Sequence, residues 1–63
     1  MQESEITSAE FSGFSALLMH EENIIKKYKC YAKTCEDPAL KELCEDMAQR
    51  HTQHYDTILN ELK

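Results

Sequence analysis

The chain has 63 residues, with 12 acidic residues against 7 lysines and arginines, and a formal net charge of −5. A chain of this length forms one small domain, which excludes Rossmann folds, barrels and two-domain enzymes. The acidic balance argues against a protein that is held on nucleic acid mainly by phosphate contacts, and against a membrane-surface helix. No apolar run reaches the roughly 20 residues that cross a bilayer, and the start of the sequence is acidic where a secretory signal would be basic, so we expect a cytoplasmic protein without a membrane partner.

A first helix is predicted over about residues 7–35. The chain contains a single glycine and a single proline, which leaves few places for turns and favours an all-α fold. Thr7 and Glu10 have the spacing of a capping box, and Ile6 with Phe11 supplies the apolar pair of a hydrophobic staple. The positions with 3,4 spacing form one face of this helix, and they are Phe11, Phe14, Leu18, Glu21, Ile25, Tyr28 and Ala32. Glu21 is the one charged residue in this stripe.

A turn at residues 36–37 separates the first helix from a second, predicted over about residues 38–62. The residue before a proline avoids helical angles, whereas Asp37 as N-cap and Pro38 as first residue favour a new helix. The stripe of the second helix is Leu40, Cys44, Met47, His51, His54 and Ile58. A connection this short makes the two helices antiparallel, so the sequence predicts a helical hairpin.

Three polar residues fall at the same depth in this hairpin. Glu21 lies 15 residues before Glu36, His51 lies 15 residues after it, and His54 is one helical turn further. Because each residue adds about 1.5 Å along a helix, we expect Glu21, His51 and His54 to converge on one level. Two interpretations remain open: the three residues bind a metal ion, or they form a hydrogen-bonded Glu–His layer that fixes the register of the helices without metal.

Each apolar stripe is wider than one neighbouring helix can cover. We therefore predict a homodimer, or a higher assembly of dimers, in which two hairpins form a four-helix bundle. A two-fold axis with the turns at opposite ends would bring two copies each of Glu21, His51 and His54 to the centre of the bundle. Six inward-facing oxygen and nitrogen donors are typical of bundle metal sites.

Short motifs carry a resemblance to a known family. They are Glu21-x6-Tyr28 in the first helix, Glu36-Asp37-Pro38-Ala39-Leu40-Lys41 at the turn, and Gln49-Arg50-His51-Thr52-Gln53-His54-Tyr55 in the second helix. With them the stretch from Leu17 to Leu62 resembles the ferritin-like superfamily, in particular rubrerythrin-like chains and the coat F family of spore-coat proteins.

The resemblance implies that the hairpin is half of a ferritin-like bundle. It implies that Glu21 is a bridging or terminal metal ligand, that His54 is the histidine of the Glu-x-x-His motif, and that Tyr28 is a hydrogen-bonding partner of the ligands. His51 stands where the family has a glutamate, which gives His-x-x-His. Neutral imidazoles suit Zn²⁺, Cu²⁺, Ni²⁺ or Fe²⁺ better than Ca²⁺ or Mg²⁺, so the expected cofactor is a divalent transition metal, iron or zinc.

Three functions follow from these patterns. The first is a ferritin-like metal-binding protein that stores, buffers or oxidises iron, as the resemblance implies. The second is a metal-free structural or interaction module like coat F, with the spore coat as its location. The third, a small RNA-binding hairpin dimer, is disfavoured by the net charge of −5. No serine or cysteine nucleophile has a base at a recognisable spacing, so the sequence leaves open whether the protein is an enzyme.

Overall fold

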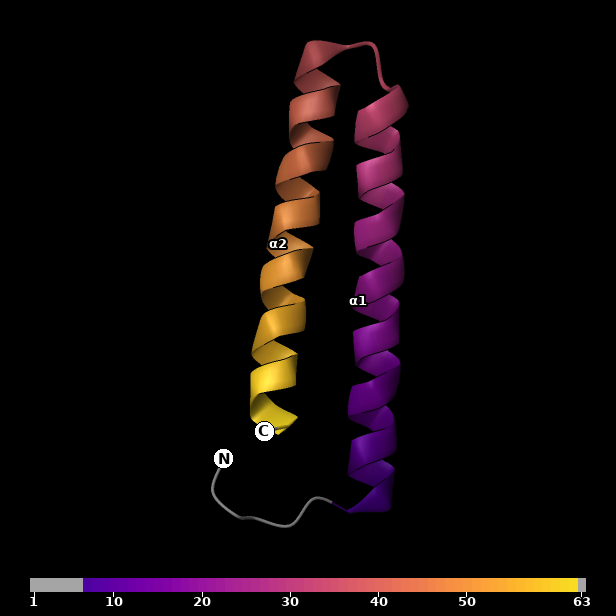
Figure 1. Ribbon diagram of the computed structural model, residues 1–63, viewed down its shortest axis with the longest axis vertical. Coiled ribbons are helices and arrows are strands. Elements are labelled where there is room, and N and C mark those ends of the chain that lie inside the picture. Colours follow the sequence, from indigo (N-terminus) through magenta and orange to yellow (C-terminus); the bar gives the residue numbers. More distant parts are fainter. Residues whose placement is uncertain (1–6, 63) are drawn as a thin grey trace.

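The computed structural model describes residues 7–62 as two helices packed side by side and joined by a short turn (Figure 1). Helix α1 spans Ser8–Thr34 and helix α2 spans Pro38–Leu62. They run in opposite directions, which confirms the predicted helical hairpin, and the hairpin measures 47 × 17 × 10 Å. Neither of the two described helices is long and apolar enough to cross a membrane.

The start of α1 is fixed by the predicted capping box. The backbone N–H of Glu10 donates to the Thr7 hydroxyl oxygen at 3.1 Å, and the backbone N–H of Thr7 donates to the Glu10 carboxylate at 3.0 Å. Two of the N–H groups that lack a partner at the start of a helix are thereby satisfied. Thr7 is the cap and not part of the helix, and Cys35 is the cap at the other end. The predicted staple includes Ile6, which lies outside the described residues.

The turn between the helices is held by Asp37. Its side chain accepts hydrogen bonds from the backbone N–H groups of Ala39 at 2.9 Å and Leu40 at 3.3 Å. Pro38, which has no N–H to satisfy, is the first residue of α2. The chain therefore reverses over Cys35, Glu36 and Asp37, and this fixed register sets which residues of the two helices face one another.

The closest packing between the helices involves small side chains. Among residues 7–62 only Ala32 and Ala48 are buried, at 6% and 5% exposure. Ala32 belongs to the predicted stripe, whereas Ala48 does not. Two other members of the predicted stripes, Phe11 and Leu40, are 56% and 51% exposed. Each helix of a lone hairpin has one neighbour, so a stripe wider than that contact leaves large side chains open to solvent.

Candidate metal centre

Glu21 of α1 meets His51 and His54 of α2 near the middle of the hairpin, as the residue counts from the turn predict. The Nδ1 of His51 is 2.6 Å from Oε1 of Glu21, and the Nδ1 of His54 is 3.8 Å from the same oxygen. An ionised carboxylate only accepts hydrogen bonds, so the Nδ1–H of His51 is the donor. These three side chains form the Glu–His cluster.

The Glu–His cluster is shielded on one side and open on the other. The side chains of Glu21 and His51 are 13% and 18% exposed, whereas that of His54 is 60% exposed. Partial removal from water strengthens the His51–Glu21 hydrogen bond, because less solvent screens it. His54 therefore lies on the open side of the cluster, where the cluster faces solvent.

The spacing of the donor atoms comes close to that of a metal site. Each of the three residues offers one ligand atom, and these atoms all lie within 4.8 Å of one another. Zinc bonds of about 2.0–2.1 Å in a tetrahedron keep the ligand atoms roughly 3.3 Å apart. The two separations from Glu21, 2.6 and 3.8 Å, lie on either side of that value, and the group spans up to 4.8 Å, so shifts of roughly 1–1.5 Å would fit the three donors to an ion.

Binding a metal at these atoms changes the hydrogen bonding of the cluster. The Nδ1 of His51 must lose its proton to donate a lone pair, so the metal replaces the His51–Glu21 hydrogen bond. Three protein donors also leave at least one coordination position free for water or for a further ligand.

Tyr28 contacts the cluster through its ring. The rings of Tyr28 and His51 are stacked, with centroids 6.1 Å apart and an interplanar angle of 15°. Tyr31 contacts Tyr28 edge to face at 6.3 Å, and His54 contacts His51 in the same manner at 5.2 Å. Over residues 7–62 the Tyr28 hydroxyl forms no hydrogen bond with the cluster, so the contact differs from the hydrogen bond that the resemblance implies. The contact between Tyr28 and the cluster is therefore the stacking of its ring on His51.

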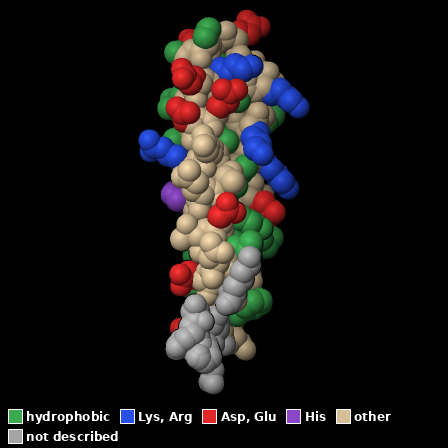
Figure 2. All heavy atoms as spheres, turned by 60° about the vertical axis from the view of Figure 1, so that its left-hand side comes forward, with side chains coloured by type: hydrophobic (Ala, Val, Ile, Leu, Met, Phe, Trp, Pro, Cys, Tyr) green, Lys and Arg blue, Asp and Glu red, His purple; other side chains and the backbone are tan. Residues whose placement is uncertain are grey.

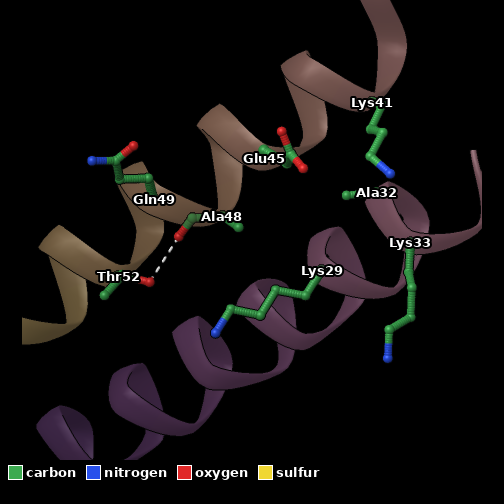
Figure 3. Close-up of a pocket in the computed structure, with 8 residues that line it drawn as sticks. All are labelled: Lys29, Ala32, Lys33, Lys41, Glu45, Ala48, Gln49 and Thr52. Atoms are coloured by element: carbon green, nitrogen blue, oxygen red, sulfur yellow. Dashed lines mark hydrogen bonds between the residues drawn. The ribbon is translucent and has the colours of Figure 1, made fainter. Parts of the chain in front are cut away.

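A second feature was not anticipated from the sequence. A groove of about 430 Å³ runs between the helices, with Ala32 and Ala48 at its floor (Figure 3). The other residues that line it are Lys29, Lys33, Lys41, Glu45, Gln49 and Thr52. The sequence signal for the groove is the pair of alanines, whose small side chains leave the space above them open.

His20, the third histidine, is exposed and does not belong to the Glu–His cluster.

The chain matches no protein-family model, and comparison with curated proteins and with solved structures gives no match either. The likeness to ferritin-like chains therefore stays a prediction from the motifs within residues 17–62.

Proposed function

We propose that this chain is a small ferritin-like metal-binding protein in which Glu21, His51 and His54 hold a divalent transition metal, iron or zinc. The observation that carries the proposal is the convergence of a carboxylate and two imidazoles, from two helices, within 4.8 Å at a partly shielded position. Storage or buffering of the metal is the role that the resemblance implies. Imidazole and carboxylate ligands with an open position suit Zn²⁺ and Fe²⁺.

The proposal includes a homodimer that completes a four-helix bundle. Large apolar side chains are exposed on both helices of the single hairpin, among them Leu17 at 47% and Leu43 at 55%. A second hairpin would cover such side chains and surround the Glu–His cluster with protein. The support for the dimer is this uncovered apolar surface, which two helices alone are too few to bury.

A metal-free structural module is the second candidate function. The 2.6 Å hydrogen bond between His51 and Glu21 satisfies both groups without an ion. Within residues 7–62 no buried polar side-chain atom lacks a partner. In this alternative the Glu–His cluster fixes the register of the helices, and replacing it costs stability without affecting any ligand.

Titration of untagged protein with Co²⁺ or Zn²⁺ separates the two candidates. The parent and His20→Ala should bind with equal affinity, because His20 is exposed and outside the cluster. His54→Ala should weaken metal binding at least about tenfold. Replacing a residue that only hydrogen-bonds to a metal ligand already lowers metal affinity by about that factor. Absence of binding by the parent, or equal losses for His20→Ala and His54→Ala, would reject the metal proposal and leave the structural module.

A further inference from the structure

The groove between the two helices has a charge opposite in sign to that of the whole chain. Three of the residues that line it are lysines, Lys29 and Lys33 of α1 and Lys41 of α2. The one acidic residue among those that line it is Glu45 of α2. Three positive side chains against one negative side chain make the groove cationic, whereas the formal net charge of the chain is −5. A cationic recess in an acidic protein attracts anions.

The three lysines lie at the end of the groove nearest to the turn. Counted from position 36, Lys33 is three residues away, Lys41 five and Lys29 seven, so they span about 6 Å along the hairpin axis. In Figure 3 the side chain of Lys41 extends from α2 toward Ala32 of α1. Figure 2 shows lysine and arginine side chains gathered in the half of the visible face toward the turn. The flexible lysine stems allow three ammonium groups to surround one anionic group at this end.

The ammonium groups of these lysines are not neutralised within the described part of the chain. The ion pairs of residues 7–62 are those of Glu21 with His51 and His54, and none involves a lysine. Glu45, although it lines the same groove, therefore leaves the three lysines unpaired. Like charges gathered around one recess repel one another, and an anion that binds among them relieves that repulsion.

Beyond the lysines the floor of the groove is apolar, because Ala32 and Ala48 form it. The groove follows α2 from Lys41 to Thr52, a length of about 16 Å. At the far end the Thr52 hydroxyl already donates to the Ala48 carbonyl oxygen at 2.8 Å. A linear apolar group that lies along this floor removes the alanine methyl groups and the apolar stems of the lysines from water.

The size of the groove favours a small molecule over a macromolecule. Its volume of about 430 Å³ lies within the range of roughly 300–1,000 Å³ that is typical of small-molecule sites. Only 8 residues line it, whereas a stable protein interface involves about 20–30 residues on each side. Nucleic acid is disfavoured as well, because the lysines span only about 6 Å and are too few to follow a phosphate backbone.

We propose that the groove binds an anionic amphiphile, a molecule with one carboxylate or phosphate head group and a linear apolar tail. The head group lies among Lys29, Lys33 and Lys41, and the tail lies along the floor that Ala32 and Ala48 form. The residues of the Glu–His cluster do not line the groove. This second site therefore does not depend on the proposed metal binding.

Calorimetric titration with decanoate and with decyl phosphate, each kept below the concentration at which it forms micelles, tests the proposal and distinguishes a fatty acid from a lipid phosphate. At least one of them should bind, with one molecule per chain, and the tighter one identifies the head group. Each CH₂ group that lies on the floor should raise the affinity by up to about fourfold, so decanoate should bind more tightly than hexanoate. Absence of binding by both anionic probes, or decanol binding as tightly as they do, would overturn the proposal.

Three substitutions locate the site of the bound probe. Lys41→Gln should lower the affinity by about two- to fivefold, the effect typical of one charge at an exposed position. Glu45→Gln should raise it by a similar factor, a gain that damage to the fold does not produce. Lys27→Gln is the matched control, because Lys27 lies outside the groove, beside Tyr28 and His51, and it should change the affinity little. Equal affinities for Lys41→Gln and Lys27→Gln, or a loss for Glu45→Gln, would show that the groove is not the site.

Discussion

At the scale of single residues, the Glu–His cluster depends on how the His51 ring is held. Its Nδ1 lies 2.6 Å from Oε1 of Glu21, and the Tyr28 ring lies nearly parallel to it with the centroids 6.1 Å apart. The convergence of Glu21 and His51 could be predicted from the sequence. Because the turn is short, residues that are equally many positions before and after it lie at the same height on the two helices. The stacking of Tyr28 could not be predicted, because it depends on side-chain rotamers that no spacing encodes.

Removal of the Tyr28 ring should loosen His51 and weaken metal binding. We expect Tyr28→Leu to lower Co²⁺ affinity by about tenfold, the size typical of residues that orient a metal ligand. Tyr28→Phe retains the stacked ring and should keep both the affinity and the visible absorption spectrum of bound Co²⁺. If Tyr28→Phe lost as much affinity as Tyr28→Leu, the hydroxyl would be the group that matters, and the stacking role would be wrong.

Metal affinity should fall as the solution is acidified. An imidazole donates its lone pair only when that nitrogen is unprotonated, so protons compete with the ion at His51 and His54. Calorimetric titration with Zn²⁺ at about pH 7.5 and at about pH 5.5 should show much weaker binding at the lower pH. An affinity that does not change between these conditions would exclude histidine ligands.

At the scale of the helices, the residues at which α1 and α2 begin and end can be predicted from the local sequence. The residues that pack between the two helices cannot. Thr7, Glu10 and Asp37 act as caps where the sequence predicts them, because a cap involves residues only two or three positions apart. The sequence does not predict that Ala48 is buried, because the predicted stripe runs through large apolar residues. Where two helices approach closely, the buried side chains are small ones. The same reasoning from the stripe predicts Leu40 in the contact, whereas its side chain is 51% exposed.

Loss of the α1 cap should lower stability. Thr7→Ala removes the oxygen that accepts from the Glu10 N–H and should reduce the free energy of unfolding by about 1 kcal/mol. Thr57→Ala is the matched control, since the Thr57 hydroxyl bonds only the Gln53 carbonyl oxygen within α2 and alanine favours helix. Urea unfolding of the two variants should therefore differ, and equal midpoints would mean that the capping box contributes nothing.

Enlarging the buried alanine of α2 should separate the helices. Ala48→Leu adds three carbon atoms at a position that is 5% exposed, and we expect a loss of about 1–3 kcal/mol. The same change at the exposed Ala16 should cost little. Thermal unfolding of both variants measures the difference. A stable Ala48→Leu variant would show that the helices do not approach closely at this residue.

At the scale of the whole molecule, the proposed metal binding would be linked to stability. Within residues 7–62 the hairpin buries only two alanines, so the proposed second copy and the proposed ion would each add stability to a small core. The donor atoms belong to different helices and come together only in the folded chain. An ion that binds the cluster therefore stabilises the folded state by mass action.

The central claim, that Glu21, His51 and His54 bind a divalent transition metal, is tested most directly by melting the untagged protein with and without Zn²⁺ at neutral pH. At about one hundred times the dissociation constant the folded state gains about 2.7 kcal/mol, which raises the melting temperature of so small a domain by the order of 10 °C. The account predicts this rise for the parent and for His20→Ala, and its loss in Glu21→Ala and His54→Ala. An unchanged melting temperature for the parent, or a full rise in His54→Ala, would contradict it.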